Sequence, residues 1–203
     1  MGTILLNTAY FPRISYFGEI KKYESVRIEA WETFGRRSPR NRCEILSANG
    51  IWLLTVPVVK AGRKKIPTRD VRLDYSEPWQ KKHFRALESA YANSPYYLYY
   101  IDEIMSFFQN REKFIIDLNM KILETLFSIL GWNKSPALSE DYVFEPDNIA
   151  DYREGSSVLH REIIPGILPA YRQTFGEKFS FVPDLSILDM LFNLGPDTDG
   201  FLE

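Results

Sequence analysis

The apolar pattern of the first thirty residues predicts two strands and a helix. Residues 3–7 are mainly apolar and end at polar Asn7, which is typical of a buried strand that leads into a loop. A short helix is predicted over residues 14–22. Residues 25–31 alternate between apolar and polar side chains, which predicts a strand with one buried face and with Glu29 on its polar face.

A hairpin is predicted in the next part of the chain. Residues 42–47 and 51–56 flank an Asn-Gly pair at 49–50, and this pair favours a tight turn because both residues tolerate positive φ. The basic segment 60–65 is predicted to be a surface loop, and residues 71–73 are predicted to form a further strand.

A helical period then replaces the strand pattern. Ser76 is predicted to cap a helix that has Pro78 in its first turn, and a second helix is predicted over residues 97–109. A third helix is predicted to begin at an Asn110 cap and to end at Gly131. The apolar stripes of the first and third helices consist of Trp79, His83, Leu87 and Ala90, and of Ile115, Leu118, Ile122, Leu126 and Ile129.

The last third of the chain is rich in Pro, Asp and Gly, and short helices are predicted near Ile164 and Leu185. The sequence therefore predicts an α/β fold, in which a mixed β-sheet is flanked by helices. The N-terminal half is expected to be strand-rich and the C-terminal half helical, within a single domain over residues 1–203.

Composition and charge exclude several classes of protein. The net charge is −2, so no global positive field favours nucleic acid. One cysteine and two histidines allow no intramolecular disulfide and make a structural zinc site improbable, and we expect no metal or cofactor. No signal peptide and no apolar run of about 18 residues is present, so we expect a cytoplasmic protein without a membrane span. Motifs for a P-loop, a dinucleotide fold and a hydrolase nucleophile elbow are also missing from the sequence.

The loop after the first predicted strand is one candidate binding site. Ligands of α/β sheets bind beyond the carboxyl ends of strands, so Asn7, Thr8, Tyr10 and Arg13 are candidate lining residues. The alternative is that this aromatic segment only packs a turn against the core.

The arginine-rich segment 36–42 is a second candidate. Arginine binds phosphate or carboxylate through two parallel hydrogen bonds, so this segment predicts an anion site for a phosphate-bearing substrate. The candidate contacts are Arg40, Asn41 and Arg42. The alternative is a solvated loop whose arginines pair with Glu29, Glu32 and Glu44.

Two residues are candidates for catalysis. Cys43 follows the arginines, which could lower its pKa and make it a nucleophile, or it is a small buried apolar residue on a strand. His83 lies on an apolar helix stripe, either as a general acid or base or as a hydrogen-bonded core residue. His160, in the irregular tail, is expected to be exposed.

Acidic residues near the C-terminus form the last candidate group. Asp184 is predicted to cap the helix that begins near Leu185. Asp189 and Asn193 follow at one-turn intervals, and Asp189 is a candidate for orienting a basic group of a substrate.

Several short motifs occur together in a characteristic order along essentially the whole chain. They comprise Tyr10 to Pro12, Tyr16 and Phe17, Glu32 to Phe34, Arg40 to Cys43, Ala48 to Gly50, Leu54 to Pro57, Trp79 to His83, Ala90 and Tyr91, Ser94 to Tyr96, and Phe181 to Asp189 with Phe192, Asn193, Gly195 and Pro196. This ordered set resembles the WbqC-like family. The chain departs from the usual family pattern at Thr8, Ala9 and Pro39, and in the stretch from Tyr171 to Gln173.

The resemblance implies an association with bacterial surface-polysaccharide and O-antigen biosynthesis. It suggests a transferase, with acyl or aminoacyl transfer to a small-molecule or carrier-linked substrate. Together with the candidate residues, this leads to the hypothesis that Arg40 and Arg42 hold a phosphate-bearing donor and that His83 transfers a proton. A non-catalytic ligand-binding or scaffold protein of the same pathway is the alternative. Nucleotidyl transfer is a weaker alternative, because the His-x-Gly-His signature is missing.

Overall fold

The computed structural model describes residues 2–35, 37–59, 65–144, 148–153 and 169–202. The predictions made for His160, for a helix near Ile164 and for most of the basic loop at 60–65 fall outside these residues. Among the described helices, none combines the length and the apolar character needed to cross a membrane.

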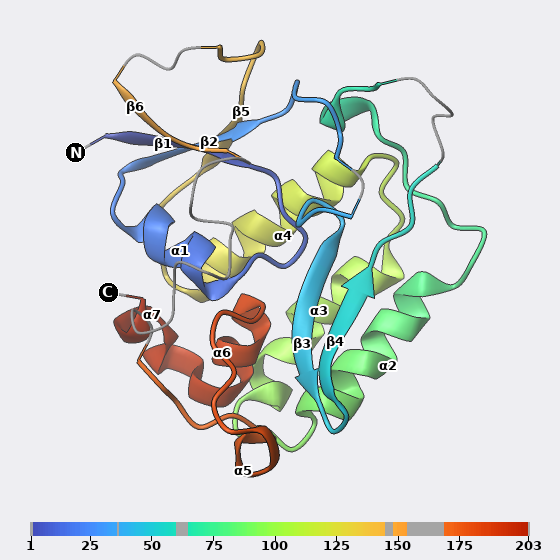
Figure 1. The fold of residues 1–203 in the computed structure, drawn as a ribbon, viewed down its shortest axis with the longest axis vertical. Coiled ribbons are helices and arrows are strands. Elements are labelled where there is room, and N and C mark those ends of the chain that lie inside the picture. Colours follow the sequence, from blue (N-terminus) through green and yellow to red (C-terminus); the bar gives the residue numbers. More distant parts are fainter. Residues whose placement is uncertain (1, 36, 60–64, 145–147, 154–168, 203) are drawn as a thin grey trace.

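A four-stranded parallel sheet lies at one end of the molecule (Figure 1). Its order is β5-β2-β1-β6, with β1 at Thr3–Asn7, β2 at Ser25–Glu29, β5 at Pro136–Leu138 and β6 at Ile149–Tyr152. Strand β1 pairs on both edges, and its apolar residues are fully buried, as expected for a central strand of a covered parallel sheet. The α/β fold with a mixed set of strands and flanking helices is confirmed, although β5 and β6 arise in a region where no strand was predicted.

The predicted hairpin is also confirmed. Strands β3, at Arg42–Ser47, and β4, at Gly50–Thr55, pair with each other as a separate antiparallel sheet. Gly50 adopts a φ of 102°, which explains the glycine in this turn. The hairpin packs against helix α2, and Figure 1 shows it in front of α2 and α3.

Helices make up most of the described structure outside the two sheets (Figure 1). They are α1 (Ile14–Lys21), α2 (Trp79–Tyr91), α3 (Tyr97–Gln109), α4 (Ile115–Ile129), α5 (Gly176–Phe179), α6 (Ile187–Leu194) and α7 (Thr198–Phe201), with 3₁₀ turns η1 (Thr68–Asp70) and η4 (Gly195–Asp197). The apolar faces of α1, α2, α3, α4 and α6, together with strands of both sheets, contribute to one cluster of buried residues that extends from Ile4 to Leu202.

Three local predictions between residues 71 and 110 are wrong. Residues 71–73 make only isolated bridges, in which Arg72 pairs with Phe114 and Leu73 with Val58. The Ser76 side chain does not cap α2, which begins after Pro78. Asn110 ends α3 instead of starting α4, because its backbone N–H bonds to Ser106 in the preceding turn.

Asp184 caps a helix, but not the one that follows it. Ser186 is the N-cap of α6, and its side chain accepts a hydrogen bond from the Leu188 N–H. Asp184 instead accepts from the Ser15 N–H in the first turn of α1, at 2.9 Å. It therefore satisfies a helix donor 169 residues away, a partnership that sequence spacing cannot reveal.

Glu29 is fully buried, contrary to the predicted polar face of β2. Its carboxylate accepts hydrogen bonds from the Ser139 hydroxyl and from the Trp31 N–H, and forms a 3.1 Å ion pair with Arg153. Arg27, on the same face of β2, is exposed, so the predicted polar face is correct at the start of the strand and wrong at its end, where these partners cover Glu29 and compensate its charge.

Candidate functional site

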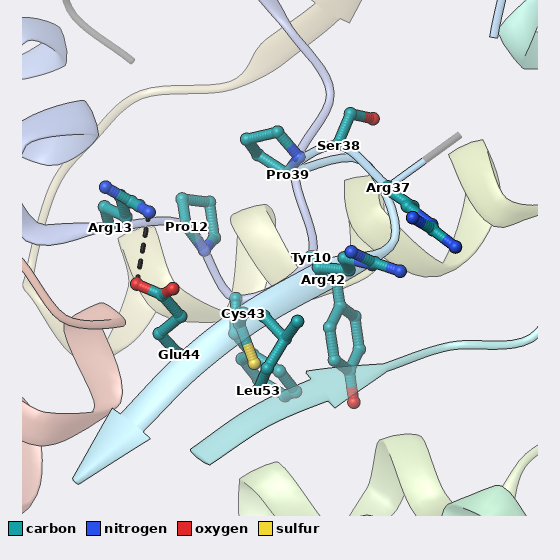
Figure 2. A pocket seen from close by; sticks show the side chains of 11 residues that line it. Tyr10, Pro12, Arg13, Arg37, Ser38, Pro39, Arg42, Cys43, Glu44 and Leu53 are labelled. Carbon is teal, nitrogen blue, oxygen red and sulfur yellow. Dashed lines mark hydrogen bonds and ion pairs between the residues drawn. The ribbon is translucent and has the colours of Figure 1, made fainter. Parts of the chain in front are cut away.

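A cavity of about 190 Å³ opens where the loop after β1 meets the hairpin (Figure 2). Three segments line it: the loop after β1, the loop before β3, and the paired strands β3 and β4. The lining residues are Tyr10, Phe11, Pro12 and Arg13, then Arg37, Ser38 and Pro39, and finally Arg42, Cys43, Glu44 and Leu53.

Backbone hydrogen bonds hold the loop after β1 to the loop before β3, and hold the start of α1 to the segment before α6. The Tyr10 N–H donates to the Pro39 carbonyl at 2.9 Å, and the Ile14 N–H donates to the Leu185 carbonyl at 3.0 Å. Phe11 has a φ of 39° and is buried against Phe107. The aromatic residues of the loop therefore pack into the core, as one interpretation predicted, and the loop also lines a cavity, while its role in binding stays a prediction.

Positive charge predominates in the cavity lining, with three arginines against one glutamate. Arg13 pairs with Glu44 at 3.1 Å, and Figure 2 shows this pair apart from the guanidinium groups of Arg37 and Arg42. Arg37 is exposed, with a φ of 61°. The Nε atom of Arg42 is buried and has no hydrogen-bond partner among the described residues. Because Arg42 also lines the cavity, its guanidinium is a candidate contact for an anion there.

Arg40 occupies a different environment from Arg42. Its side chain is only 2% exposed, and its Nε donates to Glu32 at 2.7 Å. The other Glu32 oxygen accepts from the Asn7 side chain, and the Arg40 carbonyl accepts from Asn119 at 2.8 Å. Arg40 and Asn7 thus join the end of β1 to the arginine-rich loop beneath the cavity, and neither residue is part of its lining.

Asn41 anchors the base of the hairpin. Its side-chain amide donates to the Val56 carbonyl at 3.0 Å, and the Val56 N–H donates to the Asn41 carbonyl at 2.8 Å. Asn41 is buried and is not among the residues that line the cavity.

Cys43 lies in the cavity wall but is buried. Burial raises the pKa of its thiol far above the usual range, and the neighbouring Glu44 carboxylate adds to the shift. The thiol is therefore protonated at neutral pH, which opposes nucleophilic attack by Cys43.

His83 lies behind Tyr10 and is not part of the cavity lining. Its Nδ1 is 2.9 Å from the Tyr10 hydroxyl, and its ring packs against Trp79 and Phe108. Burial lowers its pKa to about 4, although a backbone hydrogen bond with Thr55 partly opposes the shift. His83 is therefore neutral at pH 7 and touches the cavity only through Tyr10.

Asp189 lies in a separate buried cluster on α6. Its carboxylate accepts from the hydroxyls of Tyr91, at 3.0 Å, and Tyr171, at 2.6 Å, and from the Gln173 side chain at 2.9 Å. Burial raises the pKa of this carboxyl, while the three donors oppose the shift. The arrangement joins α2 and the C-terminal segment to α6 and leaves Asp189 outside the cavity.

The structure thus places the predicted site residues Tyr10, Arg13, Arg42 and Cys43 in one cavity, while Asn7, Arg40, Asn41, His83 and Asp189 support neighbouring parts of the fold. Arg37 and Leu53 also line the cavity, although neither was singled out as a contact. Arg37 belongs to the arginine-rich segment, so it was within reach of the sequence argument. Leu53 pairs with Glu44 across the hairpin, and only that register brings it to the site.

No candidate metal site was found among the described residues. The described residues contain no group of three or more His, Cys, Asp and Glu side chains that could hold a metal ion.

Comparison with known proteins shows which family the chain belongs to. An uncharacterized protein of Mycobacterium tuberculosis, Rv1507c, is 26% identical over 221 residues, which cover 95% of this chain and 91% of that protein. No solved structure matches the chain. The profile of the WbqC-like protein family matches residues 8–153, which include the loop after β1, the arginine-rich segment and the hairpin. The resemblance in the ordered motifs is therefore confirmed, and the chain belongs to the WbqC-like protein family.

Proposed function

We propose that this protein is a transferase of bacterial surface-polysaccharide biosynthesis that binds a phosphate-bearing donor in the arginine-lined cavity. Acyl or aminoacyl transfer to a small-molecule or carrier-linked acceptor is the reaction class that fits the family association. Membership of the WbqC-like family supports the pathway, and the state of Arg42 supports the ligand.

The unpaired Nε of Arg42 carries the proposal. A buried donor without a partner costs about 1–3 kcal/mol, and a ligand oxygen would remove that cost. A phosphate also matches the planar fork of a guanidinium, and the exposed Arg37 lines the same cavity and adds a second positive charge.

The size of the cavity limits what enters it. Its volume of about 190 Å³ lies below the roughly 300–1,000 Å³ of sites that enclose a drug-sized ligand. The cavity therefore accommodates a phosphate group and a few neighbouring atoms, while the rest of the donor lies outside.

A specific observation favours a second candidate, a non-catalytic ligand-binding or scaffold protein of the same pathway. The pKa of His83 is about 4, far from the neutral value that suits a general acid or base, and burial keeps the Cys43 thiol protonated. Binding would then be the whole role of the cavity.

Thermal shift measurements test the ligand class. Wild-type protein is titrated with nucleotide sugars, acyl-thioester analogues and phosphopantetheine, and a ligand at a hundred times its Kd should stabilise the protein by about 2.7 kcal/mol. Arg42→Ala should lose this response, whereas Arg85→Ala, at an exposed site on α2 outside the cavity, should keep it.

Two results would contradict the proposal: no stabilisation by any of the three ligand classes, or a response of Arg42→Ala equal to that of wild type. Mass spectrometry of the binding donor incubated with candidate acceptors separates the two candidate functions. A transferred group supports the enzyme, and a bound but unchanged donor supports the binding protein.

A further inference from the structure

We propose that the ligand of the arginine-lined cavity is an amphiphile, a phosphate monoester whose apolar chain lies along the exposed side of strand β4. The inference rests on the proposed function, because it takes the phosphate to be held by Arg42. It adds the class of group attached to the phosphate and the surface that binds this group.

Three consecutive apolar residues of β4 are exposed to solvent. Ile51, Trp52 and Leu53 are 45%, 46% and 44% exposed, although each is a large apolar side chain. Successive side chains of a strand point to opposite faces, so Trp52 points away from the face of Ile51 and Leu53, and we call only Ile51 and Leu53 the β4 strip. An exposed apolar strand favours aggregation, so proteins usually cover or charge such strands. The β4 strip carries no charge of its own.

The β4 strip joins two cavities. Leu53 lines the arginine-lined cavity, whereas Ile51 and Trp52 line a second cavity of about 310 Å³. A ligand that extends from Arg42 past Leu53 is therefore directed towards Ile51 in the lining of the second cavity.

Strand register places the strip on the correct side of the hairpin. Leu53 pairs with Glu44, and Ile51 pairs with Leu46. Paired residues point to the same face of a sheet, so Leu53 and Ile51 lie on the face of the hairpin that also carries Arg42 and Glu44. Residues two apart on a strand are separated by about 7 Å. A chain leaving the anion site therefore meets Leu53 first and Ile51 next.

The charge of the two cavities matches an amphiphile. Arginines line the first, whereas no charged residue lines the second, which is formed with Ile51 and Trp52 by Ser47, Ala48, Asn49 and Ser89. A third cavity of about 500 Å³ beside α3 and α4 differs, because its lining includes Arg111, Glu112, Lys121 and Glu124. The β4 strip thus leads from positive charge to uncharged surface.

Calorimetric titration with inorganic phosphate, butyl phosphate and octyl phosphate, all below micelle-forming concentrations, tests the inference. A fully buried methylene tightens binding about four-fold, so a half-exposed strip should give about two-fold for each added methylene. Octyl phosphate should therefore bind at least about ten-fold more tightly than butyl phosphate.

Substitutions locate the effect. Ile51→Ser, at a half-exposed position outside the lining of the arginine-lined cavity, should remove most of the gain with chain length while leaving phosphate binding unchanged. Leu53→Ser should also remove most of the gain, and its affinity for inorganic phosphate is measured separately because Leu53 lines that cavity. Leu98→Ser, at an 80% exposed position on α3, is the matched control and should keep the full gain.

The outcomes separate the two proposals. Phosphate binding that depends on Arg42 but does not tighten with chain length overturns the amphiphile and leaves the proposed function standing. No binding of any of the three probes overturns both. A chain-length gain that persists in Leu53→Ser and Ile51→Ser also overturns the inference. The inference is also overturned if sedimentation shows that wild-type protein dimerises and Leu53→Ser does not, because the β4 strip would then bind a second copy of the chain.

Discussion

Replacing Glu32 with alanine removes the carboxylate that holds the buried Arg40 guanidinium. The ion pair is 2.7 Å long, and the side chains are 12% and 2% exposed. The substitution also removes the acceptor of the Asn7 amide. It leaves the backbone of Glu32 in place, where its carbonyl accepts from Thr68. The perturbation is thus confined to the buried side-chain network beneath the cavity.

The expected loss is large because a charge stays buried without its carboxylate. Removing one partner of a buried ion pair costs about 3–5 kcal/mol, and total stabilities of such proteins are about 5–15 kcal/mol. We expect Glu32→Ala to lower the free energy of unfolding by about 4 kcal/mol. Glu32→Gln keeps an acceptor oxygen and should lose about half as much.

Urea denaturation followed by circular dichroism measures the effect. With a denaturant slope of about 2 kcal/mol per molar, the Glu32→Ala midpoint should fall by about 2 M. Glu77→Ala is the matched control, because Glu77 forms a 2.6 Å pair with Lys82 but its side chain is 71% exposed. Solvent screens this pair, so its midpoint should not change measurably. Equal midpoints for the two alanine variants would refute the reasoning that burial of Arg40 makes Glu32 essential.

Two further predictions concern His83 and Gly195. The pKa of His83 is about 4 in the folded protein, whereas the ordinary histidine pKa of 6.5 applies to the unfolded chain. Between these two pH values only the unfolded chain takes up the proton, so the stability falls as the pH falls from 6.5 to about 4. The loss should reach about 3 kcal/mol, and in urea titrations at several pH values His83→Gln should lack it; identical pH slopes for both proteins would contradict this. Gly195 has a φ of 59°, and a Cβ there would overlap the Tyr96 ring, so Gly195→Ala should cost about 2–4 kcal/mol. Its thermal midpoint should fall by several degrees, whereas Gly200→Ala, where a Cβ meets open space, should keep the wild-type value.

Local patterns were sufficient to predict much of the secondary structure. The first strand, the Asn-Gly hairpin and the helix from residue 97 to 109 all occur where apolar periodicity indicated them. These features depend on side-chain spacing within a few residues, which the sequence displays directly. Strands β5 and β6 were missed because they are short and lie in a segment rich in Pro and Asp, so that only pairing with β1 and β2 makes them strands.

The candidate site was predicted in part. Tyr10, Arg42 and Cys43 come from two predicted site segments and line one cavity. Their neighbour Leu53 enters through the register of the hairpin, and the position of Arg40 depends on Glu32. The ligand and catalytic roles assigned to these residues stay predictions.

By itself, the sequence determined the family, the α/β class and the presence of an arginine-rich segment between the first strands and the hairpin. The tertiary structure decided which charges are neutralised, since Arg40 is buried and paired with Glu32, while Arg42 lines a cavity and its buried Nε has no hydrogen-bond partner among the described residues. Only Asn41 separates these two arginines, so a sequence argument sees nearly the same local charge around both. The difference arises because pairing and burial depend on partners that folding brings from elsewhere in the chain, and these contacts set the energy of a charge inside a protein.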